Sequence, residues 1–173
     1  MYTFLEILKY VLPALIVFLT SYLLIRQFIG NEREKRSFEM HAANRKMITP
    51  IRLQAYERIT LFLERIAPDS LIRKLQHQGM KSKQLQSEMI NLIRAEYEHN
   101  LSQQIFISAE AWEVVKSAKE NTVKIINSAA DNVKPEDPAL ELGKEILESI
   151  MEMDKAPNQV AIDFIKKEVK IFY

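Results

Sequence analysis

The sequence predicts an all-α protein with an N-terminal transmembrane helix, a polar helical stalk and a cytoplasmic antiparallel helical bundle. Residues 10–25 carry no formal charge, and apolar residues are sparse in the stretch that follows. Apolar residues then recur at three- and four-residue spacing, without the alternation of a strand. We therefore divide the chain into a transmembrane anchor over 1–29, a juxtamembrane stalk over 30–48 and a helical domain over 49–173.

The uncharged stretch is shorter than the roughly 20 residues that a spanning helix needs. Apolar residues on both sides extend it to a segment from Phe4 to Ile29. Lys9 and Arg26 then fall near the two edges of a ~30 Å hydrocarbon core, where their long side chains can reach the headgroups. The segment is therefore predicted to span a bilayer.

Two alternatives to an anchor are a cleaved signal peptide and a buried core helix. A signal peptide has a small-x-small cleavage site after its apolar core, and residues 21–28 offer none. A core helix needs cover on all sides, whereas this segment is followed by a charged stretch. Both alternatives are weaker than the anchor.

Basic residues predict the orientation of the anchor. More of them follow the apolar segment than precede it, which places the carboxyl-terminal side in the cytoplasm and the N-terminus outside. The absence of cysteine agrees with a cytoplasmic domain. The charged residues expected at the membrane interface are Glu6, Lys9, Arg26, Arg33, Lys35 and Arg36.

The stalk and the domain are both predicted to be helical. The stalk either continues the anchor helix or bends at Gly30 and the asparagine after it. Thr49-Pro50, Ser82, Ser108 and Asp137-Pro138 are candidate helix starts in the domain. We expect about four long helices and one short one, packed as an antiparallel bundle. The helix after Pro138 is expected to bury an apolar face made of Leu142, Ile146, Leu147, Ile150 and Met151.

Glu96 and His99 form the one pattern in the sequence that could carry metal chemistry. Glu-x-x-His places a carboxylate and an imidazole one helical turn apart, as in di-iron bundles. Those sites need the motif twice and two further glutamates, and here it occurs once. We expect no cofactor and keep a metal site at Glu96 and His99 as a weak alternative.

The sequence lacks the residues that phosphate binding, thiol catalysis and nucleic-acid binding require. Three scattered glycines do not form a phosphate-binding loop, and a chain without cysteine has no thiol nucleophile. The 24 basic and 23 acidic residues give no overall field that would attract nucleic acid. No small-molecule substrate is indicated.

Four segments carry a resemblance to a known family: Ile48–Arg58, Arg94–Gln104, Ala111–Trp112 and Met153–Pro157, all behind an N-terminal anchor. Together they resemble an uncharacterised family of small single-span, N-terminally anchored helical proteins known chiefly from Bacteroidota. The resemblance covers nearly the whole chain and implies a protein of the bacterial inner membrane. It implies no activity and no catalytic residue.

The predicted function is that of a membrane-anchored cytoplasmic docking or scaffold module without catalysis. Its expected partners are the lipid bilayer and either another protein of a larger inner-membrane assembly or further copies of the chain. The alternative is a metal-dependent helical-bundle enzyme that uses Glu96 and His99. A stator-like stalk is disfavoured because Pro68, Gly79 and Pro135 interrupt the helices.

Overall fold

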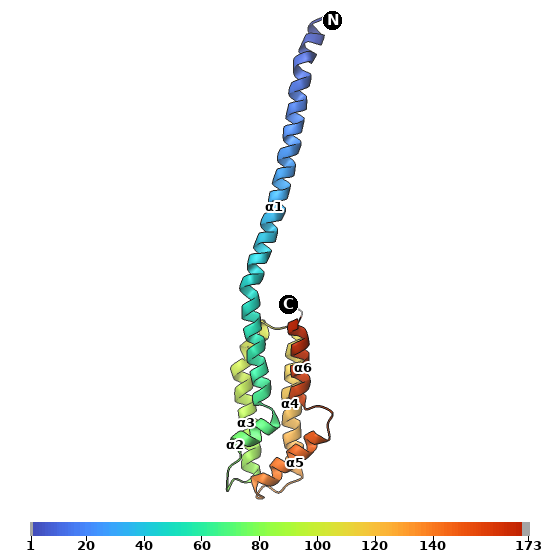
Figure 1. Ribbon diagram of the computed structural model, residues 1–173. Coiled ribbons are helices and arrows are strands. Elements are labelled where there is room, and N and C mark those ends of the chain that lie inside the picture. Colours follow the sequence, from blue (N-terminus) through green and yellow to red (C-terminus); the bar gives the residue numbers. More distant parts are fainter. Residues whose placement is uncertain (1, 171–173) are drawn as a thin grey trace. The chain divides into compact units, whose positions relative to one another are not determined.

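The computed structural model describes the backbone of residues 2–170, and the side chains of that range except residues 2–14, 31, 33, 34, 37 and 41–44. Seven helices make up this part of the chain (Figure 1). They are α1 (Tyr2–Arg65), α2 (Pro68–Leu75), α3 (Ser82–Asn100), the 3-10 helix η1 (Leu101–Ile105), α4 (Ala109–Asp131), α5 (Ala139–Met151) and α6 (Pro157–Val169). The all-α helical bundle predicted from the sequence is confirmed.

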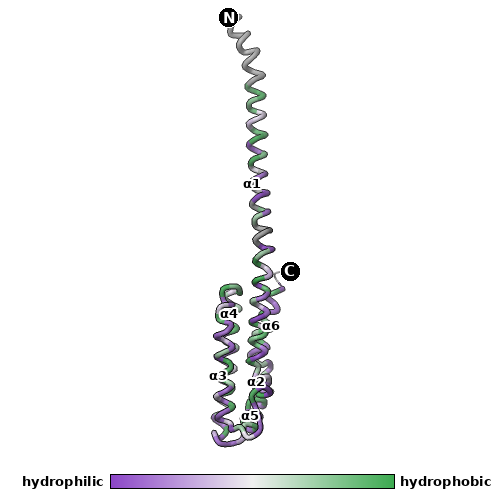
Figure 2. The backbone as a smooth tube through the Cα atoms, turned by 90° about the vertical axis from the view of Figure 1, so that its left-hand side faces the viewer, coloured by the Kyte–Doolittle hydropathy of each residue, from purple (hydrophilic) through white to green (hydrophobic). Residues whose placement is uncertain are grey.

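The chain forms two compact units, residues 1–48 and residues 49–173. In the first unit, α1 changes from mostly apolar to mostly polar residues along its length (Figure 2). Its polar part contains an i,i+4 ion pair, with Arg36 Nε 3.5 Å from Glu32 Oε1.

Among the described residues, no helical stretch combines the length and the apolar character that crossing a membrane requires. The predicted span begins at Phe4, so its first part lies among the residues whose side chains are not described.

The helix start predicted at Thr49-Pro50 is wrong, because α1 includes both residues and also Gly30. Inside a helix a proline removes one i→i−4 hydrogen bond and its ring crowds the carbonyl four residues earlier, while the other turns keep their hydrogen bonds. Sequence pattern alone therefore does not separate a proline in the first turn from one inside a helix.

The second unit has a continuous apolar core. Helix α4 packs against α3, α5 and α6, and the carboxyl-terminal part of α1 contributes Tyr56, Ile59 and Phe62, each at most 2% exposed. Burial of each such large apolar side chain contributes about 1.5–3 kcal/mol. The core therefore holds the helices in place without any disulfide, since the chain has no cysteine.

Ser108 caps α4 as predicted, because its Oγ accepts a 3.0 Å hydrogen bond from Ala111 N. Ser82 is not a cap: it lies inside α3, and its Oγ donates to Pro138 O at 3.0 Å. Asp137 does not cap α5 either, since its Oδ2 accepts from Lys134 N within the preceding loop. The Ser82 side chain therefore joins the start of α3 to the loop before α5, a contact that local sequence does not reveal.

The helix count in the second unit exceeds the expectation of about four long helices and one short one. One cause is the segment Leu101–Ile105, which follows α3 directly and forms the separate 3-10 helix η1. Another correction concerns α5, in which Leu142 and Ile146 are buried as expected while Leu147 and Met151 are exposed.

Candidate functional site

Glu96 and His99 both face α1, where each contacts an arginine. Arg65 Nη1 lies 3.1 Å from Glu96 Oε2, and Arg58 Nη2 lies 3.2 Å from His99 Nε2. Two guanidinium groups at these distances disfavour a cation at the same place. In the part of the chain whose side chains are described, no three His, Cys, Asp or Glu residues gather as metal ligands would.

The residues expected at the membrane interface divide into two groups. Arg26, Lys35 and Arg36 are exposed on α1. The side chains of Glu6, Lys9 and Arg33 lie outside the described residues.

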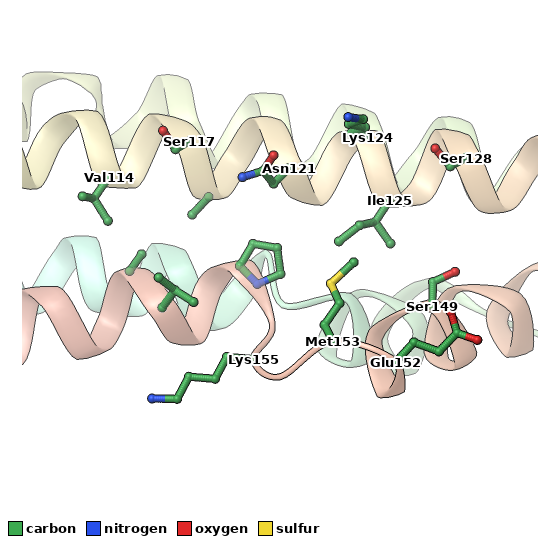
Figure 3. Close-up of a pocket in the computed structure, with 14 residues that line it drawn as sticks. Val114, Ser117, Asn121, Lys124, Ile125, Ser128, Ser149, Glu152, Met153 and Lys155 are labelled. Carbon is green, nitrogen blue, oxygen red and sulfur yellow. The ribbon is translucent and has the colours of Figure 1, made fainter.

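A cleft of about 660 Å³ lies between α4 and the segment that joins α5 to α6. In Figure 3, Ile125 of α4 points toward Met153, which comes from the opposite side, and Val114 points into the cleft from farther along α4. Polar side chains line the edges of the cleft, including Asn121 and Glu152. Such a mixture of apolar and polar groups suits the binding of another molecule.

A second hollow of about 470 Å³ extends this cleft along α4 and α6. The two share Val114, Lys155 and Val160, so we treat them as one surface, the α4–α6 groove. Five lysines and two carboxylates line the groove: Lys124, Lys155, Lys166, Lys167, Lys170, Glu152 and Asp163. Its rim is therefore positively charged.

One carboxylate of the groove is already neutralised by a lysine. Lys155 Nζ lies 2.6 Å from Asp163 Oδ2, and Gln159 Nε2 donates to Asp163 Oδ1 at 3.2 Å. The hydrogen bond from Lys155, followed by that from Gln159, lowers the pKa of Asp163 below its ordinary value. This pair connects the loop before α6 to the helix itself.

The groove was not predicted from the sequence. Its residues come from α4, α5, α6 and the loop between the last two helices, and only the packing of these elements places them together. Met153 and Val160 are apolar residues that the structure leaves exposed. In the sequence, helical periodicity alone assigns such residues to a core, so it does not indicate the groove.

Tyr97 forms an aromatic cluster beside the groove-forming helix α4. Its ring stacks on Trp112 at 5.5 Å, and Lys119 Nζ lies 4.3 Å from the ring centre. Burial raises the pKa of Tyr97, with further raising from Glu120 and Glu113 and a lowering from Lys116. These contacts fix the packing of α3 against α4.

The helices and the groove define the chain as an all-α bundle protein with a basic, partly apolar surface groove. The chain matches a family model, Family of unknown function (DUF7935), over residues 2–172. The chain therefore belongs to this family. The match confirms that the chain is a member of an uncharacterised family that covers nearly its whole length. Neither the curated proteins nor the solved structures contain a match to the chain.

Proposed function

We propose that the chain is a docking module held at a membrane by the amino-terminal part of α1. The observation that carries this proposal is the exposure of large apolar side chains around that helix. Between residues 15 and 29, the large apolar side chains that are exposed are those of Leu15, Ile16, Val17, Phe18, Leu19, Tyr22, Leu23, Leu24, Ile25, Phe28 and Ile29. A helix that is apolar on all sides needs hydrocarbon or protein around it.

The hydroxyl of Thr20, inside this apolar stretch, has a local partner. Thr20 Oγ1 donates to Val17 O at 3.0 Å, which satisfies the hydroxyl within the helix. The one charged residue between 15 and 29 is Arg26, whose side chain is long enough to reach a headgroup from near the end of a span. Lipid is therefore a suitable environment for this part of α1.

The basic residues that follow Arg26 favour an orientation with the bundle in the cytoplasm. Together with the family resemblance, this orientation supports a place at the bacterial inner membrane as an accessory subunit of a larger assembly. The α4–α6 groove is the surface of the bundle through which such a subunit would dock, because it is hollow, apolar along its floor and charged along its rim.

The membrane part of the proposal is tested by placing charge in the apolar stretch. Leu19→Arg combined with Leu23→Arg costs ~2.5–3.5 kcal/mol per arginine near the centre of a spanning helix. The variant is expected to leave the membrane fraction after an alkaline carbonate wash, whereas the unchanged chain remains there. Phe38→Arg, at an exposed position of the polar part of α1, serves as the control.

Retention of the Leu19/Leu23 variant in the washed membrane fraction would overturn the anchor. The docking part is tested separately, with a photoreactive amino acid at Ser117 in the groove and at Glu88 on α3 as a control. Ser117 is expected to give a specific cross-linked product in intact membranes. Equal cross-linking from both positions would contradict docking through the groove.

A further inference from the structure

Helix α5 carries an apolar stripe that no part of the bundle covers. The stripe consists of Leu140, Leu147 and Met151, which are 52%, 39% and 84% exposed. Residues at i, i+7 and i+11 lie along one line of a helix with 3.6 residues per turn. The buried residues Leu142 and Ile146 lie on the opposite part of its circumference, so α5 is apolar on two sides.

Helix α5 is acidic on one side of the stripe. It contains three glutamates, Glu141, Glu145 and Glu148, against one lysine, Lys144. Lys144 lies 3.1 Å from Glu141, and Glu145 Oε1 accepts a 2.7 Å hydrogen bond from Asn132 Nδ2. The stripe thus lies on a helix with a net negative charge, whereas the α4–α6 groove is lined by an excess of lysines.

The two surfaces also agree in length. Leu140 and Met151 are about 16 Å apart along the axis of α5, at ~1.5 Å of rise per residue. The α4 side of the groove runs from Val114 to Ser128, which corresponds to about 21 Å by the same rise. The groove is long enough to accept the whole stripe.

We propose that the occupant of the α4–α6 groove is α5 of a second copy of this chain, seated through Leu140, Leu147 and Met151. Opposite charges on the stripe and the groove select this pairing over contact between two stripes or two grooves. The proposal rests on the proposed docking function and names its partner. Because each chain has both surfaces, a two-fold pair makes the contact twice.

The test uses the absence of cysteine from the natural chain. Two differently tagged full-length chains are co-expressed in bacteria, one with Met151→Cys and the other with Ser117→Cys or Ser128→Cys. Because cytoplasmic thiols stay reduced, the isolated membranes are treated with copper phenanthroline in air, and oxygen accepts the two electrons released when a disulfide forms. The two groove positions lie toward the two ends of the groove on α4, so one of them meets Met151 in either direction of the stripe. A disulfide requires Cα atoms within about 7 Å, so random collisions contribute little.

A doubly tagged disulfide product is expected from one of the two pairs. Met151→Cys with Glu88→Cys is the control pair, because Glu88 is exposed on α3 and belongs to neither surface. The expected yield exceeds that of the control by at least about tenfold, as for contacts through buried apolar anchors. Equal yields from all pairs would overturn the proposal.

Charge substitutions provide a second readout that does not depend on the cysteines. Leu140→Asp with Leu147→Asp places carboxylates in the stripe, and Val160→Asp places one in the groove. Leu140, Leu147 and Val160 are exposed, so these variants are expected to keep the fold, which circular dichroism checks. In chains that carry the cysteines as well, either change alone in both copies is expected to abolish the doubly tagged product.

Mixing the two charge variants gives the sharpest result. A chain with the changed stripe keeps its groove, and a chain with the changed groove keeps its stripe, so the mixture retains one intact contact of the two. Product is expected to return when Met151→Cys is on the chain with the intact stripe and the groove cysteine is on the chain with the intact groove. No return would overturn pairing of stripe and groove.

The outcomes separate this proposal from the docking function on which it rests. If the stripe and groove cysteines give no product while Ser117 cross-links to another membrane protein, self-docking is wrong and docking stands. If the chain is lost from washed membranes while the disulfide forms, self-docking stands and the anchor is wrong.

Discussion

The hydroxyl of Tyr56 donates a 2.7 Å hydrogen bond to Glu168 Oε1 and joins α1 to α6 across 112 residues of sequence. Ser108 N donates to the same hydroxyl at 3.4 Å, at the start of α4. Arg52, one turn before Tyr56, donates to Phe106 O at 3.0 Å. These contacts fix α4 and α6, the two helices that form the groove, to α1.

Tyr56→Phe is expected to destabilise the bundle by about 1.5–3 kcal/mol, the range for a hydrogen bond to a charged group. The substitution keeps the ring in the core and removes both the donor to Glu168 and the acceptor for Ser108 N. Denaturant unfolding of the full chain in detergent measures the effect. Tyr97→Phe is the matched control, because no hydrogen bond of the Tyr97 hydroxyl occurs among the described residues, and a change below about 0.5 kcal/mol is expected.

The contribution of Tyr56 is expected to depend on pH. Burial, followed by the hydrogen bond to Glu168, raises the pKa of Tyr56, against lowering by Ser108 and Arg52. A folded-state pKa above the unfolded value of 10.0 means that the stabilisation is complete below pH 10 and is lost as the pH rises through the folded pKa.

The difference in unfolding free energy between the natural chain and Tyr56→Phe is therefore expected to be constant near neutral pH and to shrink above pH 10. Unfolding curves collected at several alkaline pH values measure this difference. A difference that stays constant through the alkaline range would contradict the raised pKa.

Asp163 is expected to show the opposite pH dependence. Its pKa is lowered from 3.8 mainly by the hydrogen bond from Lys155, so its stabilisation is present above about pH 3.8 and is lost as the pH falls through the folded value. Asp163→Asn is expected to be less stable than the natural chain at neutral pH and to approach it in acid. High salt reduces the neutral-pH difference, because the pair lies near the surface.

The two glycines of the second unit are expected to respond in opposite ways to alanine. Gly79 has φ +83°, so Gly79→Ala strains the turn and is expected to destabilise the bundle by about 1 kcal/mol. Gly143 lies within α5, where a Cβ would meet Gln76 Oε1 at 3.1 Å and Ile72 Cγ2 at 3.6 Å. The Gln76 oxygen ends a flexible side chain, so Gly143→Ala is expected to stabilise the bundle by roughly 0.5–1 kcal/mol. Thermal unfolding measures the stability change of each variant. A change of the same sign in both variants would contradict the prediction.

Sequence patterns predicted the elements whose causes are local. The cap at Ser108 depends on an N–H three residues away, and the turn at Gly79 depends on that glycine alone. The role of Ser82 was missed because its partner, Pro138 O, is 56 residues away. The Asp137 side chain accepts from Lys134 N on the loop side, so a residue that could cap the next helix closes the preceding turn instead. Tyr56 and Glu168 are too far apart in the sequence for any local pattern to relate them.

The groove and the stripe were missed for a different reason. On α5, the apolar residues from Leu142 to Met151 cover about half of the helix circumference at 100° per residue, and periodicity does not say which part of that arc is buried. Packing of α5 against α2, α3 and α4 buries Leu142 and Ile146 and leaves Leu147 and Met151 exposed. Exposure at these positions is a property of the assembled bundle.

Metal content tests the enzyme alternative. With Arg58 and Arg65 beside His99 and Glu96, the purified chain is expected to bind iron, manganese or zinc no better than the double variant Glu96→Gln, His99→Ala. Elemental analysis after equilibration with each metal measures this. Near-stoichiometric metal in the natural chain, lost in the variant, would favour the enzyme.

The most direct measurement of the central claim is the accessibility of a single cysteine in intact bacteria. Glu88→Cys places one thiol on the exposed surface of α3 in an otherwise cysteine-free chain. A membrane-anchored chain with its bundle in the cytoplasm is expected to stay in carbonate-washed membranes and to react with a membrane-impermeant maleimide only after the cells are broken. Labelling in intact cells, or recovery of the chain in the soluble fraction, would contradict the account.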